Sequence, residues 1–246
     1  MKDDAAARKK ARRQKGVFVS PLAQVVRTSV LGEPVFFTVV NRRDEIQKHH
    51  LMGAFYEPEE LAIITRHFPM GGRFLDIGTN IGNHTLYVAK FLRASRIVCI
   101  EPNPAAIAVL ESNIMLNGIH RVTDTTHLGI GLTDHAAEAA SMRVPAKNLG
   151  GSRVIEGSGD IRLERADVLL AGQEFDLVKI DVEGMELSVL SGMSGLLATH
   201  RPKMFVEVDN TNADGFEAWR KASGYQVLER FQRYSSNVNY LIGPQP

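Results

Sequence analysis

Cysteine is almost absent from the chain, and long apolar runs and a strong net charge are absent as well. Cys99 is the single cysteine among 246 residues, so internal disulfides are excluded and a reducing, cytoplasmic environment is predicted. No apolar run reaches the roughly 20 residues that span a bilayer, and no apolar signal-peptide core is found. The 29 basic and 28 acidic residues nearly cancel, so the overall charge favours no particular partner.

Residues 1–16 are the exception to this balance. They carry seven basic residues against two acidic ones, and without them the chain has 22 basic and 26 acidic residues. We interpret the segment as a solvated, flexible tail. Contact with RNA or an acidic surface is the alternative, although the tail has no aromatic residue on which a base could stack. The basic positions are Lys2, Arg8, Lys9, Lys10, Arg12, Arg13 and Lys15.

Residues 17–70 predict an N-terminal extension that precedes the main domain, 71–246. The turn signal Leu31-Gly32-Glu33-Pro34 separates two β-rich runs and predicts a hairpin of 25–30 with 35–40. This hairpin either packs on the main fold or builds a homodimer contact. Helices are predicted over 43–52 and from Pro58 to His67, since proline is well tolerated in a first helical turn.

The stretch 73–93, RFLDIGTNIGNHTLYVAKFLR, predicts a buried strand, a glycine-bearing loop and a helix. A helix N-terminus offers unpaired N–H groups and the positive end of a dipole, so it receives anionic or polar ligand groups. Ligands of an open α/β sheet bind outside the carboxyl ends of its strands. A ligand site is therefore predicted at the loop 78–82.

The loop residues distinguish between possible ligands. A dinucleotide fingerprint would need glycine at the positions of Gly78, Asn80 and Asn83, and no phosphate-binding Gly-Lys-Ser/Thr follows. Asp76, at the end of the strand, would repel a pyrophosphate but suits a positive charge. S-adenosylmethionine has an ammonium and a sulfonium and no phosphate, so it is the predicted cofactor. Its methionine end is assigned to Asp76, Gly78, Asn80 and Gly82.

A second acid supports this assignment. Glu101 ends the predicted strand 96–100 and lies 19 residues after Gly82, near the spacing at which an acid accepts both ribose hydroxyls. We interpret Glu101 as the ribose ligand, and Asn103 is assigned to the cofactor as well. The alternative is that Glu101 caps the helix that begins near Pro104.

The rest of the chain predicts further alternation of strands and helices. A third strand is predicted over 122–130, and a loop is predicted over 129–134. Residues 136–164 are read as extra strands or a flexible lid, with plain surface connection as the alternative. The other predicted elements are a strand over 175–182, a helix over 185–197, a strand over 204–208, a helix over 216–222, and an antiparallel pair over 225–229 and 238–242.

Three motifs together resemble the FkbM-like family of S-adenosylmethionine-dependent methyltransferases: Asp76-x-Gly78-x-Asn80-x-Gly82, the segment 101–104 (Glu-Pro-Asn-Pro), and the segment 179–186 (KIDVEGME). The resemblance covers roughly 55–241. It implies an α/β, doubly wound, mostly parallel seven-stranded sheet of the class I methyltransferase, Rossmann-like kind. It also implies methyl transfer, usually to a hydroxyl oxygen of a sugar, polyketide or similar small molecule.

The resemblance also implies that the segment before the cofactor strand covers the pocket, so Tyr56 and Glu57 are candidate lining residues. It further implies that the loop over 129–134 meets the adenine, with Gly131 and Leu132 as candidate contacts. For Glu57 the alternative is a charge that stabilises the N-terminus of the next helix. Methyl transfer to an alcohol benefits from a base. Asp181, at the carboxyl end of a central strand, is the first candidate, followed by Glu207 and His84.

Three alternatives concern the acids, the substrate and catalysis itself. Acids this close, with Glu183 included, could bind a divalent cation, but structural carboxylates are the commoner case and no metal ligand is predicted. An RNA or protein methyltransferase that uses the basic tail is the second alternative. The Asn-Pro-Pro-aromatic signature of amino-methylating enzymes is absent, and 181–184 (DVEG) stands in its place. A non-catalytic cofactor-binding protein is the third.

Overall fold

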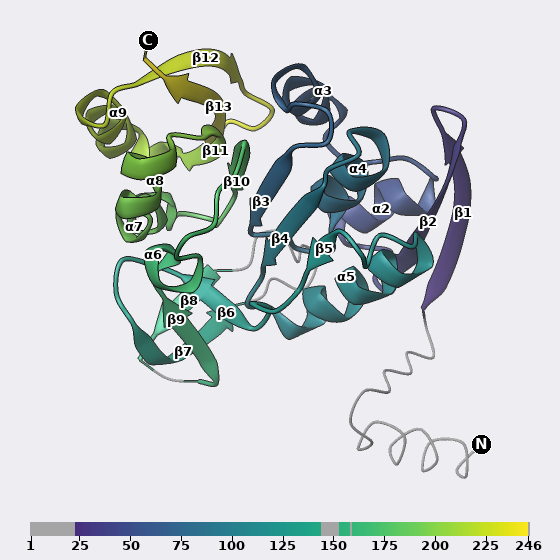
Figure 1. Cartoon of the computed structure of the whole chain (residues 1–246). Helices are drawn as coiled ribbons and strands as arrows, with labels where there is room; N and C mark the ends of the chain where they lie inside the picture. The colour runs from purple at the N-terminus through teal and green to yellow at the C-terminus, as the bar shows by residue number, and fades with distance from the viewer. Residues whose placement is uncertain (1–22, 144–152, 158, 246) are drawn as a thin grey trace.

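The computed structural model describes residues 23–143, 153–157 and 159–245, so the basic tail lies outside the described residues. A seven-stranded sheet forms the centre (Figure 1), in the order β12-β13-β11-β10-β3-β4-β5. Five strands run parallel to their neighbours from β11 to β5, and β13 is antiparallel to both β11 and β12. The strands are β3 (Arg73–Ile77), β4 (Arg96–Ile100), β5 (Thr123–Asp124), β10 (Leu177–Ile180), β11 (Lys203–Asp209), β12 (Tyr225–Phe231) and β13 (Asn237–Pro244).

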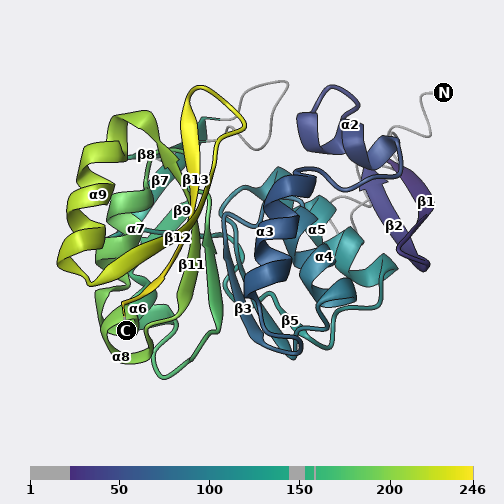
Figure 2. The same ribbon diagram turned by 90° about the horizontal axis from the view of Figure 1, so that it is seen from above.

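Helices cover both faces of this sheet (Figure 2), which confirms the predicted doubly wound α/β fold. Side chains of a strand alternate between faces, so Phe74 packs with one core cluster and Leu75 with the other. The Phe74 face is covered by α3 (Pro58–His67), α4 (Asn83–Phe91) and α5 (Pro104–Leu116). The Leu75 face is covered by α6 (Ala166–Leu169), α7 (Glu186–Gly192), α8 (Ser194–His200) and α9 (Ala213–Ala222).

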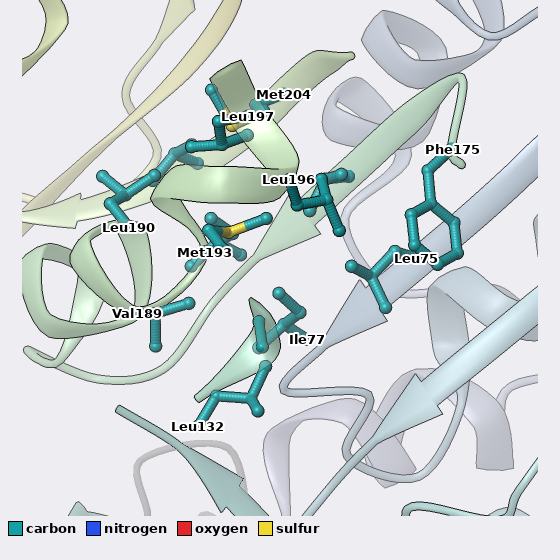
Figure 3. Close-up of a cluster of buried hydrophobic side chains, with 14 of the residues drawn as sticks. Leu75, Ile77, Leu132, Phe175, Val189, Leu190, Met193, Leu196, Leu197 and Met204 are labelled. Atoms are coloured by element: carbon teal, nitrogen blue, oxygen red, sulfur yellow. The ribbon is translucent and has the colours of Figure 1, made fainter. Parts of the chain in front are cut away.

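Figure 3 shows the second cluster, where side chains from β3, β11, α7 and α8 point toward one another. Leu75, Ile77, Val189 and Met204 are almost completely buried in it. Burying a side chain of this size contributes about 1.5–3 kcal/mol, so these contacts fix the positions of the strand ends that form the site.

The predicted N-terminal hairpin packs on the main fold. It consists of β1 (Gln24–Val30) and β2 (Glu33–Val39), followed by α2 (Glu45–Leu51). Asn113 Oδ1 and Asn117 Oδ1, both on α5 or at its end, accept the backbone N–H groups of Thr38 and Phe36 at 2.7 and 2.9 Å. The alternative of a homodimer contact is therefore not needed to explain the buried face of β2.

The predicted strand over 122–130 is wrong in its extent, and so is the loop over 129–134. The segment 125–129 is a turn in which Asp124 Oδ1 accepts the N–H of Thr126, and β6 (Ile130–Leu132) then joins a second sheet. The polar run Asp124-Thr125-Thr126 favours this turn because an aspartate oxygen binds the backbone two residues on. The second sheet has the order β6-β9-β7-β8, with β7 (Ala137–Arg143), β8 (Arg153–Glu156) and β9 (Ile161–Glu164).

Of the alternatives for 136–164, the extra strands are confirmed by β7, β8 and β9; the lid stays a prediction, and residues 144–152 and 158 of this segment lie outside the described residues. The single helix predicted over 185–197 is wrong, because Met193 (φ −116°, ψ 17°) separates α7 from α8. A Cβ on Gly192 would lie 2.0 Å from the carbonyl oxygen of Thr133, so this turn is set by contact with the chain after β6. Among the described residues, no helix has the length and apolar character to cross a bilayer.

Candidate active site

A cavity of about 600 Å³ opens at the carboxyl ends of β3, β10 and β11, the edge at which open α/β sheets bind ligands. Four parts of the chain form its wall. They are the N-terminal extension (Arg43, Glu45, Ile46, Lys48, Tyr56 and Glu57), the loop after β3 with the start of α4 (Gly78, Thr79, Asn80, Asn83 and His84), β10 and β11 with the residues that follow β10 (Lys179, Asp181, Glu183 and Glu207), and the C-terminal hairpin (Tyr234, Ser236 and Asn237).

The glycine loop lies directly against the end of β10. Gly78 has φ 77°, and a Cβ there would lie 1.8 Å from the carbonyl oxygen of Asp181, so glycine is required at this position. Asn80 is left-handed too (φ 52°), and its Oδ1 is buried without a hydrogen-bond partner among the described residues. Gly82 does not line the cavity. A Cβ on it would meet Leu110 Cδ1 at 2.6 Å, so its lack of a side chain serves the packing of α4 on α5.

Glu101 supports the loop from behind. Its Oε2 accepts the N–H of Asn80 at 2.7 Å and its Oε1 accepts the N–H of Asn103 at 2.8 Å. Burial raises the pKa of the Glu101 carboxyl to about 7. The cap of α5 is Asn103, whose Oδ1 accepts the N–H of Ala105, rather than Glu101. Neither Glu101 nor Asn103 lines this cavity, and their assignment to the cofactor stays a prediction.

Asp76 lies beneath the loop and is completely buried. Lys179 is its register partner on the neighbouring strand β10, so both side chains project to the same face. Lys179 Nζ is 3.3 Å from Asp76 Oδ1, 3.3 Å from Asp181 Oδ2 and donates a hydrogen bond to Gly78 O. The other oxygen of Asp76 accepts from Thr85 Oγ1 at 2.7 Å. Asp76 therefore positions Lys179, which in turn positions Asp181, and a contact of Asp76 with the cofactor stays a prediction.

The cavity wall has more acidic than basic side chains, although Arg43, Lys48 and Lys179 also line it. Glu57, Asp181, Glu183 and Glu207 all lie on its wall. Burial raises the pKa of Glu207 to about 10 and that of Glu57 to about 8, and the charge of Asp181 contributes to both shifts. Carboxylates crowded in this way repel one another, so a proton or a cation is favoured between them.

His84 lies in the first turn of α4 and is 5% exposed. Its Nε2 is 3.7 Å from Glu57 Oε2 and has no hydrogen-bond partner among the described residues. Burial lowers the pKa of the imidazole well below its usual value, so the ring is neutral near pH 7. A neutral imidazole can accept a proton, which is the property that a base needs.

Asn83 is a structural link that the sequence analysis did not identify. Its Oδ1 accepts the N–H of Tyr56 and its Nδ2 donates to Tyr56 O, so one carboxamide fixes the segment that covers the cavity. His50 Nε2 is 3.1 Å from the same Oδ1, and its ring stacks on Phe37 of β2. The N-terminal extension is thereby bound to the start of α4. The one feature of Asn83 noted in the sequence is that a dinucleotide-binding site would have glycine at this position.

The structure thus brings together on one wall the candidate bases Asp181, Glu207 and His84 and the loop residues Gly78 and Asn80. It also places Tyr56 and Glu57 there, as expected. The candidate adenine contact Leu132 is 5% exposed and packs in the core between β3 and α7 (Figure 3), so its side chain is committed to packing.

Comparison with known proteins identifies the family of this fold and site. The family model described as the methyltransferase FkbM domain matches residues 76–234. The hexuronic acid methyltransferase AglP of Haloferax volcanii is 32% identical over 174 residues, which cover 68% of each chain.

Two solved structures share the fold at low identity. The methyltransferase FkbM from Methylobacillus flagellatus KT has a TM-score of 0.51 at 17% identity, over 71% of this chain and 44% of that one. An uncharacterized protein from Listeria monocytogenes serotype 4b has a TM-score of 0.53 at 12% identity, over 77% and 69% of the two chains. The match therefore spans less than half the length of the first of these structures. At these identities the likeness concerns the class I methyltransferase fold alone.

Proposed function

Since the chain belongs to the FkbM methyltransferase family, we propose that its cavity transfers a methyl group from S-adenosylmethionine to a hydroxyl of a sugar or related small molecule. The observation that carries this proposal is the position of Asp181. It lies at the carboxyl end of a central strand, on the cavity wall, with its carboxylate 3.3 Å from a buried lysine. Membership of this family also argues against the alternative of a non-catalytic cofactor-binding protein.

The cavity wall fits the methionine end of S-adenosylmethionine. Asn80 Oδ1 is a buried acceptor that has no partner in the part of the chain that the structure describes, and an ammonium group has three N–H donors to offer. The acids of the wall favour a positively charged ligand as well. Each carboxylate oxygen of Glu101 already accepts one hydrogen bond, from the N–H of Asn80 or of Asn103. Only the remaining lone pairs of these oxygens could accept hydrogen bonds from the ribose hydroxyls. S-adenosylmethionine, when bound, supplies a methyl group activated by the sulfonium.

The chain's own part in the reaction is to orient the acceptor and to receive its proton. The leaving sulfur is neutral, so no general acid is needed, but an alcohol is a weak nucleophile and benefits from a base. Asp181 is the proposed base or orienting residue. Lys179 fixes its carboxylate by the 3.3 Å contact. Glu207 and His84 are the next candidates, since both line the same cavity. Alignment of the acceptor oxygen supplies much of the remaining acceleration.

A sugar acceptor is favoured over a polyketide because the curated relative is named a hexuronic acid methyltransferase. The cavity also has many side chains that can bind hydroxyl groups, among them Tyr56, Tyr234 and Asn237. Tyr56 Oη and Tyr234 Oη are 2.6 Å apart, so they join the N-terminal extension to the C-terminal hairpin above the strand ends. The RNA or protein alternative depends on residues 1–16, outside the described part of the chain.

The test is methyl transfer from radiolabelled S-adenosylmethionine to a panel of uronic acids and neutral glycosides. With an acceptor that turns over, Asp181→Asn should lower kcat by about 10² to 10⁴, the usual contribution of a base, while cofactor binding stays within about twofold. Loss of cofactor binding without loss of kcat would contradict the role given to Asp181. If RNA is methylated, and deletion of residues 1–16 abolishes this activity, the acceptor is a nucleic acid and not a sugar.

A further inference from the structure

Three carboxylates of the cavity converge on one point. One ligand oxygen each from Asp181, Glu183 and Glu207 lies within 4.8 Å of the other two. The strand register explains this proximity, since Ile180 on β10 pairs with Val206 on β11 and the residues that follow are the two acids. Glu183 turns back toward them with φ 51°.

The limit of 4.8 Å is the widest separation between two ligand oxygens that the coordination sphere of a hard divalent cation allows. A Mg²⁺ site with bonds of about 2.1 Å places opposite oxygens about 4.2 Å apart, and a Ca²⁺ site with bonds of about 2.4 Å places them about 4.8 Å apart. All three ligand atoms are carboxylate oxygens, with no sulfur ligand, which suits Mg²⁺, Mn²⁺ or Ca²⁺ better than Zn²⁺.

A second observation concerns His84, which lies on the wall of the same cavity. His84 is 5% exposed, lines the same cavity and has a buried Nε2 that lacks a hydrogen-bond partner among the described residues. This nitrogen is directed at Glu57, 3.7 Å from Oε2 and beyond hydrogen-bond distance. Buried polar atoms nearly always have a partner. Water bound to a cation would supply one, because Mg²⁺ in particular keeps several of its waters.

We propose that Asp181, Glu183 and Glu207 bind one hard divalent cation in this cavity, with a water of the ion hydrogen-bonded to His84. The ion stabilises the crowded carboxylates, which otherwise repel one another. If the proposed function holds, the ion also binds two adjacent hydroxyl oxygens of the acceptor and makes one of them easier to deprotonate. The acceptor oxygen then lies beside Asp181, which as a ligand of the ion has the orienting role, and its proton passes to His84, the candidate base that is not a ligand. The acceptor is then a molecule with two hydroxyl groups on adjacent carbons.

The test is titration of MnCl₂, MgCl₂ and CaCl₂ into the full chain after treatment with EDTA, without S-adenosylmethionine. Isothermal calorimetry and the electron paramagnetic resonance signal of free Mn²⁺ should give one site per chain. Glu207→Gln and, separately, Glu183→Gln should each weaken binding at least about tenfold, since each removes one of three charged ligands. Glu111→Gln, an exposed acid on α5, is the matched control and should leave the dissociation constant unchanged.

Absence of saturable binding by the folded wild-type chain up to about 10 mM would overturn the proposal, as would binding that both glutamine variants retain. Circular dichroism serves to check that each variant is folded. Two independent variants keep the test valid if one of them does not fold. Because no cofactor is present, the result does not depend on the proposed function. A chain that binds S-adenosylmethionine but no cation would contradict only the cation site.

Discussion

Lys179 and Asp76 face each other on neighbouring parallel strands, and their charged atoms are 3.3 Å apart in the interior of the sheet. Both side chains are almost completely buried. The same lysine reaches Asp181 at the cavity wall and the carbonyl oxygen of Gly78 in the loop. The ammonium group of Lys179 therefore connects Asp76 on β3, the loop at Gly78 and the proposed base Asp181.

Lys179→Met should destabilise the protein strongly, because it leaves Asp76 buried and unpaired. Removal of one partner of a buried ion pair costs about 3 to 5 kcal/mol. Urea denaturation followed by circular dichroism measures the change. The double variant Lys179→Met with Asp76→Leu should recover a large part of the loss, since no charge is then left unpaired. The control Lys221→Met removes an exposed lysine and should leave the midpoint unchanged. Equal effects of the two lysine variants would contradict the account.

His50 should make the stability depend on pH. Burial lowers the pKa of its imidazole from 6.5 to about 4, so between these values the unfolded chain binds a proton that the folded chain does not. The free energy of unfolding should therefore fall as the pH is lowered through this window, by at most about 3 kcal/mol. In His50→Gln, whose glutamine can still bind Asn83, this pH-dependent loss of unfolding free energy should be absent. Denaturation curves of both proteins at pH 7 and pH 4 give the comparison, and parallel curves would contradict the prediction.

Gly78→Ala should be far more damaging than the same change at Gly118. Both glycines have positive φ, 77° and 66°, so both variants carry the cost of a left-handed alanine, about 1 kcal/mol. A Cβ on Gly118 meets nothing within 4 Å, whereas on Gly78 it would lie 1.8 Å from Asp181 O. The additional loss at Gly78 should be at least about 2 kcal/mol, because backbone must move. Similar melting temperatures of the two variants would show that the loop does not lie against β10 as described.

Local patterns in the sequence were sufficient to predict most of the helices and strands and several residues of the cavity wall. The strand, loop and helix over 73–93 follow from residue types that lie next to one another in the chain. Asp181 and Glu207 were predicted because the carboxyl end of a strand can be recognised without knowing its neighbours. The resemblance of the three motifs to the FkbM-like family then gave the doubly wound sheet.

The features that were missed depend on contacts between distant segments. The pairing of Lys179 with Asp76 requires that β10 and β3 be adjacent, a relation that no local pattern carries. The link from Asn83 to Tyr56 and His50 spans about 30 residues of sequence and has no periodic signal. The break at Met193 arises because Gly192 touches Thr133, so an apolar helical pattern could not reveal it.

The most direct test of the account is calorimetric titration of S-adenosylmethionine into the wild type and Asn80→Gly. The account predicts one site per chain and binding weakened about tenfold or more in the variant, the cost of one hydrogen bond to a charged group. Glycine suits the left-handed backbone at Asn80, so only the carboxamide is lost. Leu31→Gly makes the same change at an exposed left-handed residue outside the cavity and should bind like the wild type. No binding by a folded wild type, or equal binding by all three proteins, would contradict the cofactor site proposed here.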